Sequence, residues 1–384
     1  MTIESAPTPT IDDRFENMII APERVLEMLG RQPTGAVRYE HSEQGDARRE
    51  LLHVEKIAIE NRRLQEKTEA TYLGMISHQF HDILLSEMTE CLGHTSELFA
   101  SILNIPDNIG ELFDALAVRA CSVSKLEPIV ATMPWLYEDL ITLVNTPRFR
   151  RKDARGRIIV VDSLRTALSF LGIENLRLLI PNVVLKRAIP QVTDPYPQIK
   201  QRLNAYATGV SLTARHIAQE NGLNKYEAYT LGLLSNLGRC AVIRLYFKLF
   251  DKIQIQLLKD CQKNKEQKRH EALVKLVPSA NHIIALEQEF ADSVSADVLD
   301  KMQLQRLQIA QSMRTCATNA PAQESTLSKV LHQSRAYTQI RMLHQLNFVE
   351  LPEVKPLFRE QKFPSGSLEN LKHTDIFTLP LTKN

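Results

Sequence analysis

Glycine and cysteine are both scarce in this chain. The 384 residues include only 13 glycines, whereas average usage is roughly 7%. The sequence is therefore poor in the turn residues that sheet-rich folds and glycine-rich nucleotide loops require. Five cysteines stand far apart without a CxxC pair, at Cys91, Cys121, Cys240, Cys261 and Cys316. An odd, scattered set is not a disulfide framework, so we expect reduced thiols.

Long apolar runs and a charge excess are also missing. No apolar stretch approaches the roughly 18 residues that a transmembrane helix needs, and the first residues lack the basic and apolar regions of a signal peptide. The 47 Lys and Arg nearly balance the 45 Asp and Glu, which gives a net charge of +2. No large charge attracts nucleic acid or an acidic membrane. We therefore expect a cytoplasmic protein that binds neither.

Helical periodicity is the dominant pattern that the sequence does contain. Apolar residues recur at three- and four-residue spacing, and no segment shows sustained alternation with β-branched residues. One such face consists of Leu203, Ala207, Val210, Ala214 and Ile217. The sequence therefore predicts an all-α fold.

Proline marks the expected boundaries of three regions. Pro106 interrupts the helical pattern, and prolines with Ser and Lys become frequent after about residue 350. Proline ends helices because it lacks the backbone donor and clashes with the preceding turn. We expect a helical N-terminal extension over 1–102, a helical domain over 103–345, and an extended or disordered tail over 346–384.

The N-terminal extension contains a charged helix, predicted over about 46–72. Its narrow apolar seam consists of Val54, Ile57, Leu64 and Met75. Such a seam gains by pairing with another helix. It predicts a weak homodimer or a transient partner complex, unless the helix folds back onto its own chain. We expect this extension to dimerise or to sense a partner, and a second helix to follow over about 76–103.

Two local clusters of residues could bind a metal ion or phosphate groups. His78, His81 and Asp82 fall on one helical stretch and could bind a metal, or could be ordinary helix-surface residues. A basic run could grip the phosphates of nucleic acid or of a nucleotide messenger, or could be a solvated loop. The run consists of Arg148, Arg150, Arg151, Lys152, Arg155 and Arg157.

Three segments, taken in order, resemble the HDOD domain family. The first ends in Asn145-Thr-Pro, where the family typically has an NSP step. The second, from Ile158 to Arg177, resembles the family's SIxxAIxxLGxxxLRxL pattern. The third, Leu231 to Arg239, reads LGLLSNLGR where related sequences read AGLLHDIGR. The resemblance covers about residues 106–337.

Four positions within these motifs are expected to be structural. Asn145 should cap a helix or turn the chain into the basic run. Gly172 should end a helix with a positive φ. Gly232 and Gly238 belong to the third motif.

The family resemblance also implies a cavity that has lost its metal ligands. HDOD domains resemble the HD superfamily of metal-dependent phosphohydrolases, which hold metal with histidines and aspartates. In this chain the first His position falls on Tyr206, the His-Asp pair on Ser235 and Asn236, and the last Asp on Arg335 or Ala336. These residues offer a divalent ion no imidazole and no carboxylate. We therefore expect no catalytic residue, no metal and no other cofactor.

The remaining pocket residues keep two interpretations. Tyr206, Ser235, Asn236 and Arg239 are either hydrogen-bonded core residues or the polar contacts of a small ligand or peptide. The resemblance implies a non-catalytic bacterial signal-transduction protein that acts through protein–protein interaction, alongside two-component or cyclic di-GMP systems. The alternatives are a metal-dependent phosphohydrolase or phosphodiesterase, and a nucleotide- or nucleic-acid-binding regulator that uses the basic run.

Overall fold

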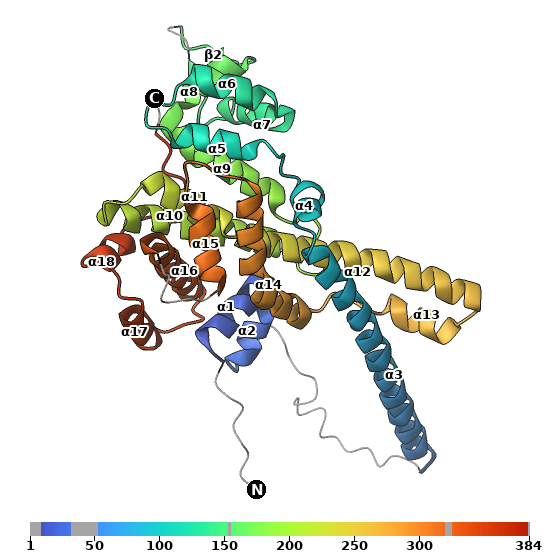
Figure 1. Cartoon of the computed structure of the whole chain (residues 1–384). Helices are drawn as coiled ribbons and strands as arrows, with labels where there is room; N and C mark the ends of the chain where they lie inside the picture. Colours follow the sequence, from blue (N-terminus) through green and yellow to red (C-terminus); the bar gives the residue numbers. More distant parts are fainter. Residues whose placement is uncertain (1–8, 32–52, 153–154, 319–324, 383–384) are drawn as a thin grey trace.

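The computed structural model of the chain describes residues 9–31, 53–152, 155–318 and 325–382, without the side chains of 53–65 and of Lys152. Helices make up nearly all of its regular structure, as the periodicity predicts (Figure 1). In the described part, the single sheet is an antiparallel pair of two-residue strands, β1 (Arg151–Lys152) and β2 (Ile158–Ile159). This hairpin lies within the basic run.

The chain begins with two short helices that pack into the core. Helix α1 (Ile11–Ile20) starts at a capping box in which Thr10 and Asp13 satisfy each other's backbone donors. Helix α2 (Glu23–Met28) is followed by Gly30 with φ +64°. Helix α1 is not evident from the sequence. The core buries its Phe15, Met18, Ile19 and Ile20 side chains.

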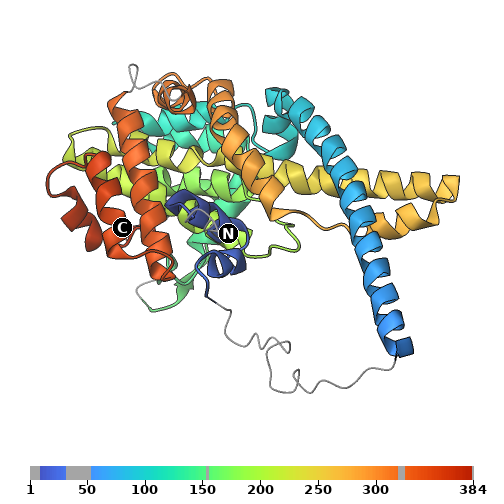
Figure 2. The same cartoon turned by 90° about the horizontal axis from the view of Figure 1, so that it is seen from below.

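One long helix replaces two predicted ones. Helix α3 (His53–Leu92) runs through the expected break near residue 75, because that stretch contains no proline and Gly74 costs a helix only about 1 kcal/mol. Its second half packs on α12 (Leu237–Asn264), where the rings of Phe80 and Phe250 are 4.7 Å apart. Its first half projects from the body as a rod (Figures 1 and 2).

Part of the predicted apolar seam lies outside the described side chains. The side chains of Val54, Ile57 and Leu64 are not described, whereas the Met75 side chain is described and is 50% exposed. Gly93 ends α3, and the chain continues through α4 (Thr95–Glu97) and the π-helix η2 (Leu98–Ile102). These turns connect the rod to the family-like region.

Five helices with the hairpin form the upper part of Figure 1. They are α5 (Ile109–Ala117), α6 (Val123–Ala131), α7 (Pro134–Val144), α8 (Leu164–Leu171) and α9 (Ile173–Ala188). Pro134 begins α7 at a helix N-terminus, where a missing backbone donor costs nothing. Buried Leu136, Leu140 and Val144 form the inner face of α7.

The central layer contains the remaining large helices. In addition to α12, these are α10 (Ile199–Glu220), α11 (Lys225–Leu234), α13 (Gln267–Val274), α14 (Ala280–Lys301), α15 (Ile309–Thr318) and α16 (Thr326–Gln345). Two motif glycines allow close packing here. A Cβ on Gly232 would lie 2.8 Å from the Ser211 Cα, and one on Gly238 would lie 1.9 Å from the Ala291 carbonyl oxygen.

The segment expected to be extended or disordered contains two helices, α17 (Leu351–Glu360) and α18 (Ser367–Lys372). Pro352 and Pro356 do not prevent α17. Pro352 lies in its first turn, where no intrahelical donor is needed. Beyond α18, the core buries the Ile376 side chain. Thr382 exchanges backbone hydrogen bonds with the Asn175 amide, at 2.8 and 3.0 Å.

Within the described ranges, no single helix is both long enough and apolar enough to cross a membrane. Helices α8 and α9 meet the length and composition criteria only as a pair, and they meet at 109°.

Candidate functional site

The four residues predicted for the family cavity line one hollow. It has a volume of about 270 Å³ and lies where α1, α10, α12, α14 and α16 meet. Tyr206 comes from α10, Ser235 and Asn236 from the junction of α11 and α12, and Arg239 from the first turn of α12. Arg335, one of the two residues aligned with the last metal ligand, also lines it.

The side chains of Ser235 and Asn236 donate hydrogen bonds to the backbone of the preceding helix. The Ser235 hydroxyl and the Asn236 amide each donate to the Gly232 carbonyl at 3.0 Å. Ser295 from α14 fastens the same junction, because it accepts from the Gly238 N–H at 2.8 Å and donates to the Ser235 carbonyl at 2.9 Å. The side chains of Ser235 and Asn236 are both buried. Their hydrogen bonds support the interpretation of these two residues as satisfied core residues.

Arg239 joins two carboxylates inside the cavity. It donates to Glu16 of α1 at 2.8 Å and to Glu287 of α14 at 3.0 Å. Burial raises the pKa of Glu287 despite the charge of Arg239, and the nearby Glu16 raises it further. Two carboxylates that share one guanidinium in a buried place cannot both ionise without cost. Glu287 therefore holds a proton more readily than an ordinary glutamate does.

Tyr206 is enclosed by aromatic and cationic neighbours. Its ring centroid is 4.7 Å from that of Phe15 on α1, and the Arg239 guanidinium lies 5.8 Å from it. Burial raises the pKa of Tyr206 to about 12. The phenol is therefore neutral at physiological pH. Helix α1 thus contributes both a ring and a carboxylate to the cavity.

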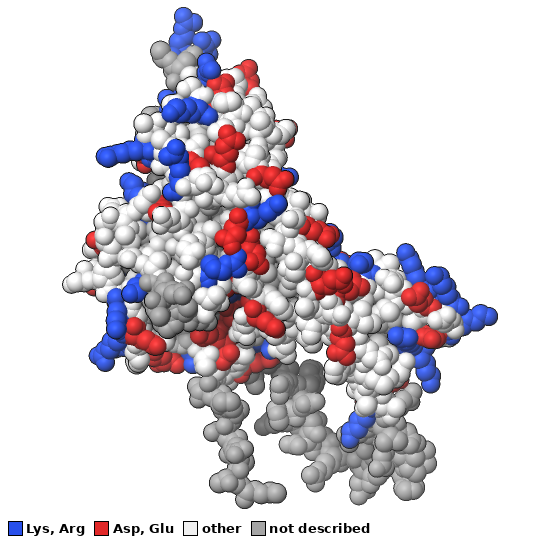
Figure 3. All heavy atoms as spheres, in the orientation of Figure 1, with Lys and Arg blue, Asp and Glu red and all other residues white. Residues whose placement is uncertain are grey.

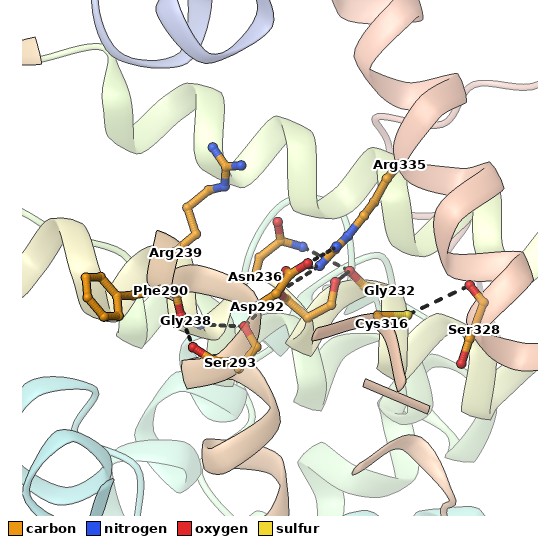
Figure 4. A network of polar contacts seen from close by, with 12 residues as sticks. Gly232, Asn236, Gly238, Arg239, Phe290, Asp292, Ser293, Cys316, Ser328 and Arg335 are labelled. Carbon is orange, nitrogen blue, oxygen red and sulfur yellow. Dashed lines mark hydrogen bonds and ion pairs between the residues drawn. The ribbon is translucent and has the colours of Figure 1, made fainter. Parts of the chain in front are cut away.

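A second ion pair crosses the cavity from the opposite wall. Arg335 of α16 reaches Asp292 of α14 with two hydrogen bonds, both 2.8 Å long, and Figure 4 shows the pair beside Asn236. Burial opposes ionisation of Asp292, but the charge and hydrogen bonds of Arg335 hold its pKa below the usual value. This bidentate geometry is the strong form of an arginine–carboxylate contact.

The expectation that this place offers no carboxylate is wrong. Glu16, Glu287 and Asp292 all line the cavity. Glu16 was missed because α1 lies far outside the family-like segment, and its approach is a tertiary contact. Arg335 was the signal available in the sequence, because an arginine that is buried in a cavity is almost always paired.

The structure does not bring His78, His81 and Asp82 of α3 together into one site. His78 pairs with Asp82 at 3.1 Å on the exposed face, whereas His81 is buried and stacks on His282 of α14 with ring centroids 3.9 Å apart. In the part of the chain that the structure describes, no group of three or more His, Cys, Asp or Glu is placed to hold a metal ion.

The basic run does not converge on one surface. Arg151 lies over the Phe170 ring at 4.4 Å, and Arg148 donates to the Leu379 carbonyl at 2.8 Å. Arg155 and Arg157 are exposed near the tip of the hairpin, where Figure 3 shows Lys and Arg side chains at the top of the view. The structure therefore does not bring these arginines together into a phosphate site.

Asn145 and Gly172 have the structural roles predicted for them. Asn145 ends α7, and its amide group exchanges hydrogen bonds of 2.8 and 2.9 Å with the Val161 backbone, which closes the base of the hairpin. Gly172 joins α8 to α9 with φ 75° and ψ 154°. That conformation is essentially restricted to glycine.

A family model for the HDOD domain matches residues 102–279. No curated protein matches the chain. Among solved structures, the chain is similar to a protein from Shewanella amazonensis whose name assigns it provisionally to the metal-dependent phosphohydrolases. The identity is 13%, the TM-score is 0.39, and the match covers 76% of this chain and 95% of that one. The family match shows that the chain contains an HDOD domain.

Proposed function

We propose that this protein is a non-catalytic regulatory protein of bacterial signal transduction, which acts in the cytoplasm through protein–protein contacts of its HDOD domain. The observation that carries the proposal is the pairing of charges in the cavity. Arg239 forms ion pairs with Glu16 and Glu287, and Arg335 forms one with Asp292. These contacts hold α1, α12, α14 and α16 together.

The donor set does not fit a catalytic metal centre. Carboxylates line the cavity, but the guanidinium groups of Arg239 and Arg335 lie among them and would repel a divalent ion. None of the described residues that line this hollow is a histidine, whereas HD-type chemistry needs a metal that acidifies a bound water. These features favour the regulatory function over the phosphohydrolase or phosphodiesterase alternative.

A metal-dependent hydrolysis assay separates these two functions. The full chain is incubated with bis(p-nitrophenyl) phosphate and Mn²⁺, Fe²⁺ or Mg²⁺, and its metal content is measured by elemental analysis. We expect no stoichiometric metal and no hydrolysis above the background of the metal alone. Hydrolysis that Asp292→Asn abolishes, with a metal that the same variant loses, would show that the protein is an enzyme.

We propose α3 as the main protein-contact element. Its first half extends beyond the body in both views (Figures 1 and 2), and its second half, beside α12, leaves the apolar side chains of Met75 and Leu85 about half exposed. These two side chains would gain apolar burial by contact with another chain. We propose a weak dimer or a transient partner complex rather than an obligate one, since association itself is costly.

Sedimentation analysis of the full chain tests this contact. Met75→Lys and Leu85→Lys change exposed positions, so the fold should survive, and we expect both to weaken self-association or capture of a host partner. Ile158→Lys is the matched control, because Ile158 is equally exposed but lies on the hairpin. If all three variants associate like the original protein, α3 is not the interface.

A further inference from the structure

A second, larger cavity lies at the opposite end of α10 from the paired charges. Its volume is about 840 Å³, and the ends of α9, α10 and α11, the segment after α5 and the C-terminal segment form its walls. Among the described residues, four basic side chains line it, and Glu174 is the single acidic one. The basic residues are Arg119, Arg177, Arg215 and Lys225.

The side chains decide the sign of the electric field in this cavity. Helix α11 begins at Lys225 and α10 ends at Glu220, so the positive end of one helix dipole lies close to the negative end of the other. The two dipoles oppose each other. The excess of basic over acidic side chains therefore makes the cavity positive.

Arg177 is already committed to the protein. It donates to the Leu116 and Val118 carbonyls, each at 2.9 Å, and it pairs with Glu174. These contacts neutralise the one acidic lining residue, and they fix the chain immediately before Arg119. Arg177 is thus a positioning residue for the wall that carries Arg119.

The other three cations have no ion pair among the described residues. Arg119 and Lys225 are exposed, and Arg215 is half-buried on the inner wall. Three unpaired cations around one concave space favour a ligand with several negative charges.

The size and the remaining walls narrow the class of ligand. Pockets for small molecules measure about 300–1,000 Å³, so this cavity exceeds the needs of a single phosphate ion. Ala117, Leu178, Leu223 and Pro380 supply apolar surface beside the cations. We propose that the cavity binds a small organic polyphosphate of the nucleoside triphosphate class, with its phosphates on Arg119, Arg215 and Lys225. This ligand site is independent of the charge-paired cavity and of the function proposed above.

Calorimetric titration of the full chain at low salt tests the site, with ATP, GTP and sodium tripolyphosphate as probes. We expect at least one nucleotide to bind more tightly than tripolyphosphate, because the apolar wall adds contact. Affinity should fall as salt rises. Arg119→Gln and Lys225→Gln should each weaken binding at least tenfold, since both remove a phosphate contact from an exposed position.

Lys248→Gln is the matched control, because Lys248 is exposed on α12 and does not line the cavity. Circular dichroism and thermal melting without ligand verify that each variant is folded. The proposal is overturned if none of the three probes binds, if tripolyphosphate binds as tightly as the nucleotides, or if the control loses as much affinity as the cavity variants.

Discussion

At the residue scale, two helical glycines have opposite surroundings. A Cβ on Gly238 would lie 1.9 Å from the Ala291 carbonyl oxygen, whereas one on Gly74 would have nothing within 4 Å. The backbone of α14 cannot move away cheaply, so Gly238→Ala should lower the free energy of unfolding by about 1–3 kcal/mol or more. Gly74→Ala should raise it by up to about 1 kcal/mol, because alanine favours the helix. Urea unfolding of both variants measures the contrast, and similar values for the two would contradict the close packing of α12 on α14.

The protonation of Glu287 is a second residue-scale property. Its pKa in the folded state is raised by burial and by Glu16, so the folded chain keeps a proton that the unfolded chain loses. The unfolded state then binds fewer protons, and the free energy of unfolding falls as pH rises above the ordinary pKa of glutamate. Glu287→Gln should flatten this decline by at most about 1.4 kcal/mol per pH unit.

Chemical denaturation from about pH 5 upward measures this effect, since the ordinary glutamate pKa is about 4.3. Glu289→Gln changes an exposed carboxylate two residues away on the same helix and should leave the slope unchanged. An equal slope for Glu287→Gln and the unmodified protein would show that Glu287 is ionised in the folded state.

At the scale of elements, α1 belongs to the core of the molecule. Phe15 is fully buried against Tyr206, and Arg14 pairs with Glu353 of α17 at 3.0 Å. Phe15→Ala should therefore cost about 3–5 kcal/mol of stability. Leu351→Ala, at a side chain that is 64% exposed, should cost far less. Equal losses in guanidinium unfolding would mean that α1 is a detachable segment.

The N-terminal extension was predicted as a unit, but its two parts behave differently. Helix α1 closes the charge-paired cavity through Glu16, whereas the first half of α3 projects from the body (Figure 1). The sequence predicts helices in the region of α3, where the apolar pattern is regular, but not α1. It does not reveal that α1 packs on α14 and α16, because those contacts join residues more than 200 positions apart.

At the scale of the whole molecule, the C-terminal segment ties distant parts together. Ile376 is buried, Phe377 lies against Gly209 of α10, and Thr382 binds Asn175 of α9. Ile376→Ala should therefore cost about 2–5 kcal/mol in equilibrium unfolding. Val277→Ala, at a side chain that is 64% exposed, is the control. A loss no greater than that of the control would mean that the segment contributes little to the fold.

The sequence predicted which motif residues line the candidate site, but it did not predict the carboxylates beside them. Tyr206, Ser235, Asn236 and Arg239 do line one cavity, because the spacing of the motifs on their helices carries that information. The carboxylates that neutralise the arginines come from α1 and α14, at positions that no local pattern marks. The polyphosphate cavity likewise combines residues from five segments, so no motif in the sequence announces it.

The sequence by itself determined the helical class, the turn at Gly172, the role of Asn145 and the family of the central domain. These depend on short-range physics, namely periodicity, backbone freedom and capping, which each act within a few residues. The tertiary structure decided the continuity of α3, the ordered C-terminal helices, the insertion of Glu16 and the pairing of each arginine. Such features depend on which faces pack together across the whole chain, because local preferences are small compared with the burial that overrides them.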